Sequence, residues 1–351
     1  MKIVILLFLL GLFGHMLWTY FKIGTSNQAP LDIKTPDGYD QPYHPSVLFF
    51  ENGWCGYRYW MAASPWPIGG EPYRDRWEYP CIYASNDGVN WNLIGENPLD
   101  DLTESEIDEL DYFSDPELVM NGDTMECWYR MTKRRGVKKI HDKIVYLFRR
   151  TSTDGLNWTP RDTIMETGKE IADPKDIFFS HSLRYVDNRY LMWYTAYNDK
   201  GSLEVRYQDA DSTAKLWSDV KKCNLIGYEG EIEPWHISIM YEDGVYNLIL
   251  YNFFDISLWT SEDGINFTYK WDLLKRKRVI GSYHYDLYRA SLIKDDVSYK
   301  LYFSCDSGRK TYIGLMQGSS LDSLKILDTN KVFCKSFLEF IPYYFITPFS
   351  R

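Results

Sequence analysis

The stretch Ser152-Thr-Asp-Gly-Leu-Asn-Trp158 decides the fold, because close copies of it recur along the chain. Two copies are Ser85-Asn-Asp-Gly-Val-Asn-Trp91 and Ser261-Glu-Asp-Gly-Ile-Asn-Phe267, and a degenerate one is Asp211-Ser-Thr-Ala-Lys-Leu-Trp217. An Asp-Gly pair favours a tight turn, because glycine accepts a positive φ and aspartate bonds to its own backbone. The closing aromatic ring is expected to fold over the turn. A strand-rich unit repeated every roughly 50–70 residues predicts a radial array of small sheets.

Strands can be assigned on both sides of the turn phrases. Each unit has an opening strand that begins with a polar residue, a short turn, and then an aromatic strand. Alternation of large apolar and smaller residues favours strands over helices. The opening strands are 44–50, 115–120, 181–186, 233–240 and 288–293. Five units predict an all-β fold, a five-bladed β-propeller over residues 39–330, with a pair of β-sandwiches as the alternative.

Composition limits the function classes. The net charge of −10 argues against a nucleic-acid partner, because phosphates would be repelled. The 6 cysteines have no CxxC spacing, which argues against a zinc cluster and leaves isolated disulfides open. Aromatic residues make up 17% of the chain, and exposed aromatic rings stack well on sugars. No cofactor is predicted.

The N-terminus is distinct from the repeats. An apolar run from residue 3 to about residue 21 is long enough to cross a bilayer core of about 30 Å as a helix. The run ends in bulky aromatics and not in small residues, which favours an uncleaved anchor over a cleaved signal peptide. We therefore expect a transmembrane helix in residues 1–24 and a linker in 25–38. The globular domain would then lie outside the cytoplasm, and the apolar tail 331–351 is left without a role.

The Asp-Pro and Glu-Pro strand openings, the aromatic second strands and the turn phrases together resemble the five-bladed propeller glycoside hydrolases, the clan that contains families 43 and 32. The resemblance runs from about residue 39 to about residue 327. It implies a carboxylate base or nucleophile from the first blade and an acidic glutamate from a later blade. It also implies a further aspartate that orients the acid.

Two carboxylates match parts of that pattern. Glu233 heads the fourth opening and is the candidate general acid, with Glu231 as the second choice; the alternative is an acidic strand end in solvent. Asp115 heads the second opening, and Pro116 restricts the backbone after it. Asp115 is predicted to bind a sugar hydroxyl or to act as base, unless it only caps a turn.

The first blade departs from the family pattern. His44-Pro45 stands where the similar enzymes would carry Asp-Pro, and Asp40 is the nearest upstream carboxylate. The base is therefore left open between Asp40 and Asp115. His44, His181 and His236 lie at or just beyond three openings, where they could hydrogen-bond a sugar or, less expectedly, bind a metal.

Three further residues are candidates for substrate binding. The fork of Arg289 suits a sugar carboxylate or vicinal hydroxyls, with an ion pair to Asp286 as the alternative. Trp66 and Trp235 are candidate stacking surfaces. Two basic clusters, 133–139 and 275–278, are expected to be solvated loops, or else to attract an acidic polysaccharide or membrane headgroups.

The predicted function is hydrolysis of a cell-surface or exported polysaccharide by paired carboxylates, with carbohydrate and membrane as partners. The alternative is a non-catalytic carbohydrate-binding propeller that lacks the first-blade carboxylate. A protein-interaction scaffold is less favoured, because the strand openings are polar and charged.

Overall fold

A computed structural model describes residues 2–21, 29–67, 78–108, 111–133, 144–167, 178–198, 200–252, 255–275, 286–306, 310–328 and 335–344. Its helices are Lys2–Thr19 (α1), Glu104–Asp108 (α2), Phe337–Tyr344 (α3) and the 3-10 turn Leu321–Ser323 (η5). Its strands are Pro42–Trp54 (β1), Tyr57–Pro65 (β2), Cys81–Ser85 (β3), Asn92–Leu93 (β4), Tyr112–Asn121 (β5), Thr124–Lys133 (β6), Ile144–Ser152 (β7), Asp162–Thr167 (β8), Phe178–Val186 (β9), Arg189–Tyr197 (β10), Leu203–Ala210 (β11), Lys221–Lys222 (β12), Asn224–Ile226 (β13), His236–Glu242 (β14), Val245–Tyr251 (β15), Asp255–Ser261 (β16), Asn266–Lys275 (β17), Asp286–Lys294 (β18), Tyr299–Asp306 (β19), Thr311–Gly318 (β20) and Lys325–Ile326 (β21).

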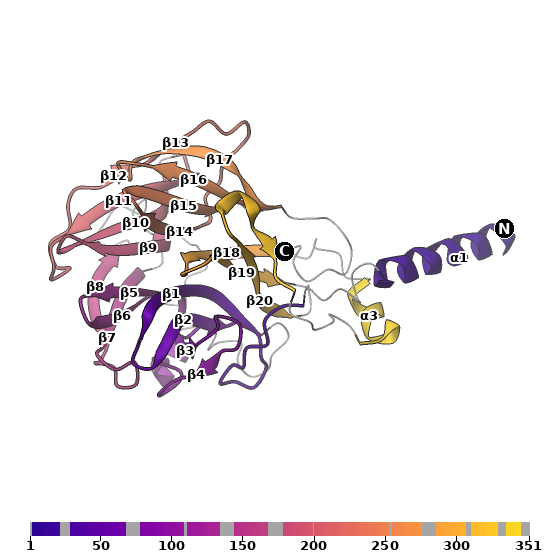
Figure 1. Cartoon of the computed structure of the whole chain (residues 1–351), viewed down its shortest axis with the longest axis horizontal. Helices are drawn as coiled ribbons and strands as arrows, with labels where there is room; N and C mark the ends of the chain where they lie inside the picture. Colours follow the sequence, from indigo (N-terminus) through magenta and orange to yellow (C-terminus); the bar gives the residue numbers. More distant parts are fainter. Residues whose placement is uncertain are drawn as a thin grey trace.

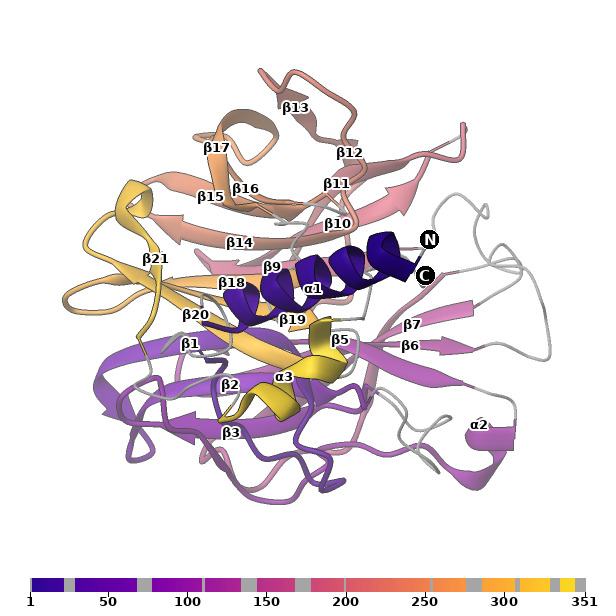
Figure 2. The same ribbon diagram turned by 90° about the vertical axis from the view of Figure 1, so that its right-hand side faces the viewer.

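These strands form the predicted five-bladed β-propeller. The blades are β1–β4, β5–β8, β9–β12, β14–β17 with β13 added at its edge, and β18–β21. Strands within a blade pair antiparallel, except that β13 runs parallel to β17. The innermost strands β1, β5, β9, β14 and β18 lie around the centre of the molecule (Figure 1), and β12, β13 and β21 lie at its edge (Figure 2).

The ring closes without exchange of a strand, because every strand of the last blade comes from one continuous segment. Side-chain oxygens of the fifth blade accept backbone N–H bonds from the first. Val47 N–H donates to Ser291 Oγ at 3.0 Å, and His44 N–H donates to Ser304 Oγ at 2.9 Å. The predicted linker adds a further contact, because Leu31 N–H donates to Ile313 O at 3.0 Å and Leu31 itself is buried.

Serines tie other blades together in the same way. Leu118 N–H of the second blade donates to Ser46 Oγ of the first at 3.1 Å. Ile239 N–H of the fourth blade donates to Ser182 Oγ of the third at 2.9 Å. Inner strands of different blades share no backbone ladder, so these buried N–H groups need side-chain acceptors. The hydroxyls therefore hold the inner strands at fixed heights along the axis.

The turn phrase works as predicted. Asp154 Oδ1 accepts the N–H groups of Leu156 and Asn157, each at 2.8 Å, and Ser152 Oγ accepts Gly155 N–H at 2.8 Å. Gly155 has φ +72°, and its Cα lies against the ring of Trp60 in the preceding blade. Trp158 folds over the turn and donates from Nε1 to Gly155 O at 3.3 Å. Each phrase thus shapes its own blade edge and docks onto its neighbour.

The degenerate copy keeps the same geometry. Trp217 Nε1 donates to Ala214 O at 3.1 Å, as Trp158 does in the second blade. Ala214 is buried and has φ +59°, a left-handed conformation that glycine adopts without strain. The third blade therefore keeps the turn at some cost in backbone strain.

The innermost strands bulge at one end. Register shifts separate Tyr43 from Ser46 in β1, Ser114 from Glu117 in β5, and Leu287 from Ala290 in β18. His44 and Asp115 fall inside the first two bulges, with φ +53° and +54°. A bulge leaves one residue out of the ladder and re-aims its side chain. Several blades thereby turn a polar side chain toward the axis.

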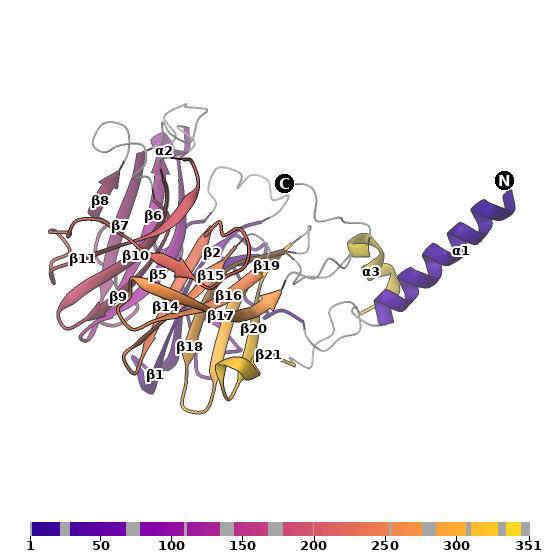
Figure 3. The same cartoon turned by 90° about the horizontal axis from the view of Figure 1, so that it is seen from above.

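The N-terminal prediction is not supported. Helix α1 has 18 residues, and in the described part of the chain no helix is both long and apolar enough to cross a membrane. α1 lies beside α3 away from the sheets (Figure 3), and Phe13 contacts Phe337 edge to face at 5.8 Å.

Other expectations are met in part. Helix α2 lies in an acidic segment that ends where β5 begins, at Tyr112. The five described cysteines are free, so no disulfide forms among them. The second basic cluster lies almost wholly outside the described residues, as does most of the first.

We predict that Gly155→Ala destabilises the protein by more than its backbone strain alone. A Cβ at this position would overlap the Trp60 ring, and the residue already has φ +72°. Gly122 is the matched control, because it has φ +60° but a Cβ there would meet nothing within 4 Å. Gly122→Ala should lower the free energy of unfolding by about 1–2 kcal/mol, and Gly155→Ala by about 3 kcal/mol or more. Urea denaturation measures both, and equal losses would contradict the docking role of the turn.

Candidate functional site

Three buried polar side chains meet at the propeller axis. His44 comes from β1, Asp115 from β5 and His236 from β14, so three blades contribute one residue each. Each offers a nitrogen or carboxylate oxygen, and these atoms lie within 4.8 Å of one another. All three residues are at most 4% exposed. His44 and Asp115 head their predicted opening strands, whereas His236 lies three residues after the predicted fourth opening at Glu233.

Asp115 is the most heavily paired member of the group. Its Oδ2 lies 3.1 Å from Arg130 Nη2, and its Oδ1 lies 3.3 Å from His236 Nδ1 and 3.5 Å from Arg289 Nη1. Burial raises the pKa of this carboxyl, but the nearby His236 and Arg130 outweigh burial and hold the pKa well below its usual range. Asp115 is therefore an ionised carboxylate at neutral pH.

Burial shifts the pKa of both axial histidines downward. Burial lowers the pKa of His44 well below its ordinary value, although Asp115 partly opposes this. Burial also lowers the pKa of His236, again against the effect of Asp115. His44 Nδ1 lies 3.0 Å from Ser64 Oγ and 3.6 Å from Glu78 Oε2, which favours a proton on Nδ1. His44 Nε2 and His236 Nε2 have no hydrogen-bond partner among the described residues.

Arg289 joins this group to a second buried carboxylate. Its Nη2 donates to Glu117 Oε2 at 3.1 Å and to His181 O at 3.2 Å, and its Nη1 donates to Pro116 O at 3.4 Å. Glu117 also accepts bonds from Ser182 Oγ at 2.9 Å and Arg184 Nη1 at 3.1 Å. Burial raises the pKa of Glu117, and the charge of Arg289 opposes that rise.

Aromatic rings surround the two imidazoles. Tyr288 lies edge-on to His236 with 4.1 Å between ring centroids, and it stacks on Tyr43 at 5.2 Å. The Trp66 ring lies 5.6 Å from His44, and Trp235 Nε1 donates to the Tyr288 hydroxyl at 2.8 Å. Trp66, Trp235 and Tyr288 are partly exposed. Both predicted stacking tryptophans thus lie near the axial group and are partly exposed.

The remaining predicted residues have different surroundings. Glu233 and Glu231 are exposed in the loop before β14, which begins only at His236. Asp40 forms an ion pair with Lys34 at 2.7 Å and accepts Thr35 N–H at 3.3 Å. His181 is fully buried, and its carbonyl oxygen accepts a bond from Arg289, whose side chain is 1% exposed and pairs with buried carboxylates. Their assigned roles stay predictions.

Sequence reasoning missed Glu117, Arg130, Glu78 and Tyr288. A signal for the alignment was present, because serine follows two residues after the axial residue in His44-Pro-Ser46, His236-Ile-Ser238 and Arg289-Ala-Ser291. That spacing aligns His236, and not Glu233, with His44 and Arg289, whereas the second blade has Glu117 at the serine position. Aligning the blades on X-Pro pairs instead placed Glu233 at the opening of the fourth blade.

The three axial residues have the chemistry of a metal-binding group, although no metal was predicted. Two neutral imidazoles and one carboxylate are ligands that zinc and other divalent transition metals accept, with a position left for water or substrate. Buried polar atoms without partners are costly, and His44 Nε2 and His236 Nε2 are two such atoms. The hydrogen bond on Nδ1 of His44 also fixes its ring, as is usual for a metal ligand.

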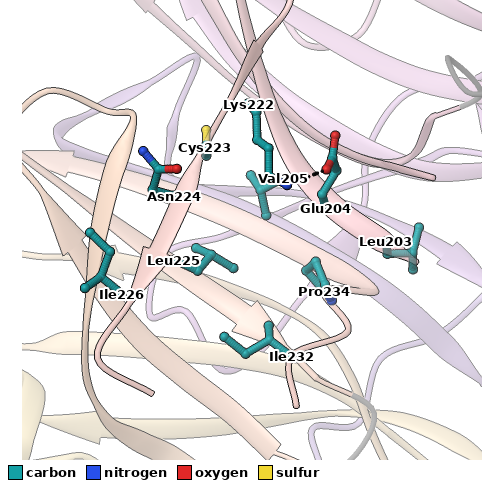
Figure 4. Close-up of a pocket in the computed structure, with 10 residues that line it drawn as sticks. All are labelled: Leu203, Glu204, Val205, Lys222, Cys223, Asn224, Leu225, Ile226, Ile232 and Pro234. Carbon is teal, nitrogen blue, oxygen red and sulfur yellow. Dashed lines mark ion pairs between the residues drawn. The ribbon is translucent and has the colours of Figure 1, made fainter. Parts of the chain in front are cut away.

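A cavity of about 440 Å³ lies elsewhere, between the third and fourth blades (Figure 4). Its lining includes Leu203, Leu225 and Ile232, with Lys222 and Glu204 paired at 2.8 Å on one side. No member of the axial group lines it. The cavity therefore adds nothing to the chemistry described above.

The chain is similar in sequence to one curated carbohydrate-modifying enzyme. No protein-family model matches the chain. A curated relative, the A type blood N-acetyl-α-D-galactosamine deacetylase of Flavonifractor plautii, is 26% identical over 242 residues. That match covers 58% of this chain and 30% of the relative's length.

Solved structures show the same fold. An N-acetylgalactosamine deacetylase from F. plautii, in complex with blood group B trisaccharide, superposes with a TM-score of 0.62 and 19% identity over 89% of this chain and 97% of that chain. The GH43_1 enzyme from Xanthomonas citri with xylotriose gives 0.56 and 10%, covering 89% and 96% of the two chains. Xylan β-1,4-xylosidase from Bacillus halodurans gives 0.56 and 18%, covering 84% and 56%. The chain therefore has the five-bladed propeller fold of family 43 glycoside hydrolases and of this deacetylase.

We predict that His181 makes the protein less stable in acid. Burial lowers its pKa to about 3, from an ordinary value of 6.5. Between these pH values the unfolded chain binds a proton that the native protein does not, so stability falls as pH falls, by about 1.4 kcal/mol per pH unit. His181→Gln should reduce the slope of unfolding free energy against pH between 6 and 4.5 by about that amount. Urea titrations at several pH values measure it, and an unchanged slope would rule out this histidine as the source.

Proposed function

We propose that this chain is a metal-dependent carbohydrate hydrolase that removes the acetyl group from an N-acetylated amino sugar. The observation that carries the proposal is the buried group of His44, Asp115 and His236 on three different blades. The deacetylase name of the F. plautii relative supports the choice of substrate, since that relative is similar in both sequence and fold.

Hydrolysis of the acetamide requires the following changes. Water adds to the acetamide carbonyl, the C–N bond breaks, acetate leaves, and the amine takes a proton. A divalent ion, when bound, would polarise the carbonyl and lower the pKa of water. His44, Asp115 and His236 would hold that ion, while Arg130 and Arg289 keep Asp115 ionised and oriented.

The aromatic residues supply the carbohydrate surface. Trp66, Trp235 and Tyr288 are partly exposed beside the two imidazoles, and the hydrogen bond from Trp235 to Tyr288 fixes both rings. A sugar ring stacked there would present its substituents to the axial group. Tyr43 lies behind Tyr288 and is itself buried, so it supports the surface without forming it.

Glycoside hydrolysis by Glu233 and Asp115 is the competing assignment. It requires two carboxyl groups on either side of the glycosidic oxygen. Asp115 is buried in ion pairs, and Glu233 is exposed in a loop outside β14. This arrangement supports hydrolysis of the acetamide better than hydrolysis of a glycosidic bond. A binding protein without catalysis is the third outcome that the following experiment separates.

We predict acetate release from oligosaccharides that end in N-acetylgalactosamine or N-acetylglucosamine. Treatment with EDTA should remove the activity, and Zn²⁺, Mn²⁺ or Co²⁺ should restore it. Asp115→Asn and His236→Gln should each lower kcat/KM by about 100-fold or more, because each removes a ligand. Acetate is measured by a coupled enzymatic assay, and released reducing sugar is measured in the same samples.

The two assays distinguish the three assignments. Reducing-sugar release that Glu233→Gln abolishes would establish the glycosidase and overturn the deacetylase. Sugar binding by calorimetry without either product would establish the binding protein. Acetate release that is insensitive to EDTA and to His236→Gln would contradict the metal centre.

Action outside the cytoplasm, on a cell-surface or exported polysaccharide, stays a prediction. It is motivated by the apolar run of residues 3–21. A C-terminal alkaline phosphatase fusion is active only after export, so an inactive but intact fusion would overturn it.

A further inference from the structure

The second blade carries a different residue type at the inner-strand position where the other blades have a serine. Ser46, Ser238 and Ser291 each stand two residues after an axial residue, and Ser182 stands at the matching place in β9. The second blade has Glu117 there instead. Glu117 is 2% exposed, so its charge is buried where the other blades carry a neutral hydroxyl. A buried carboxylate is costly unless it is paired, and this one is paired with two guanidinium groups.

The guanidinium of Arg289 lies between the two carboxylates of β5. Its Nη2 is 3.1 Å from Glu117 Oε2, whereas its Nη1 is 3.5 Å from Asp115 Oδ1. The guanidinium is planar and rigid, so a bond at one amino group fixes the position of the other. Carbonyl oxygens of His181 and Pro116 accept further bonds from it. Arg289 therefore lies closer to Glu117 than to Asp115, and its bonds to Glu117 and to the two carbonyl oxygens keep it at that distance from Asp115.

We propose that Glu117 sets the affinity of the His44–Asp115–His236 group for its divalent ion, by holding the Arg289 guanidinium away from Asp115. This inference rests on the metal centre of the proposed function. Glu117 is a positioning residue, because it touches Arg289 and none of the three ligands in the contacts described above. Without the charge of Glu117, Asp115 would be the remaining carboxylate partner of Arg289. The guanidinium would then move closer to Asp115 Oδ1. The lone pairs needed by the ion would then be occupied.

The experiment measures ion binding directly. The full chain is freed of metal with EDTA, and binding of Zn²⁺, Mn²⁺ and Co²⁺ is measured separately by titration calorimetry. Glu117→Gln keeps the shape of the side chain and removes its charge. Loss of an outer partner of a metal ligand typically weakens binding by about 10–100-fold, and that loss is expected here.

Glu126→Gln is the matched control. Glu126 is also a glutamate that is 2% exposed, and it lies in β6 of the same blade. It accepts bonds from Trp128 Nε1 at 2.8 Å and Tyr190 Oη at 2.7 Å, and it lies 3.7 Å from Arg149 Nη1. Its partners do not include the axial residues, so ion affinity should be unchanged even if thermal stability falls.

A double-mutant cycle tests the route through Arg289. In an Arg289→Gln background, Glu117→Gln should change ion affinity by less than about threefold, because contacting residues that act through one another are not additive. A full 10–100-fold loss in that background would overturn the route. Circular dichroism checks that each variant is folded. If the double variant is unfolded, the inference is tested by the comparison of ion affinity between Glu117→Gln and Glu126→Gln.

The outcomes separate this inference from the proposed function. Ion binding that weakens in Glu117→Gln and not in Glu126→Gln supports the inference, even in a protein without deacetylase activity. Equal ion affinity in the wild-type protein and Glu117→Gln overturns it while the deacetylase stands. A wild-type chain that binds none of the three ions overturns the metal centre and this inference together.

Discussion

The burial of an ionised Asp115 at the axis is the constraint on which the arrangement of the blades depends. A carboxylate removed from water costs several kcal/mol unless it is paired on all sides. Its partners come from the bulge of β18, the second strand of its own blade and the start of β14, namely Arg289, Arg130 and His236. Three of the five blades must therefore stand at one height for the charge to be tolerated, and the cross-blade serine bonds fix that height.

Backbone strain is concentrated at the same place. His44 and Asp115 have φ of +53° and +54°, in a region that side chains other than glycine rarely occupy. Such residues cost about 1–3 kcal/mol each and persist only where their surroundings fix them. The bond from His44 N–H to Ser304 Oγ and the ion pair of Asp115 with Arg130 supply that support. The strain turns both side chains into the centre, where a regular strand would alternate them to either face.

The fold could be predicted from the sequence because its signal is local and repeated. Asp154 and Gly155 specify their turn through bonds within four residues, and the phrase occurs often enough to count blades. The functional site was harder to predict from the sequence than the fold. Glu233 resembled Asp115 because proline follows both, but only the register of hydrogen bonds across blades aligns Asp115 with His236. Glu117 and Arg130 act through partners that are distant in sequence, which no periodicity indicates.

The buried charges at the axis are paired. At the axis and beside it, the guanidiniums of Arg130, Arg184 and Arg289 match the carboxylates of the candidate ligand Asp115 and of Glu117 and Glu78. A divalent ion would add positive charge to this balance. Amide hydrolysis develops negative charge on the carbonyl oxygen, which positive surroundings stabilise. Glycoside hydrolysis develops positive charge on the sugar ring, which they oppose. A divalent ion held by His44, Asp115 and His236 would therefore suit the proposed amide hydrolysis better than glycoside hydrolysis.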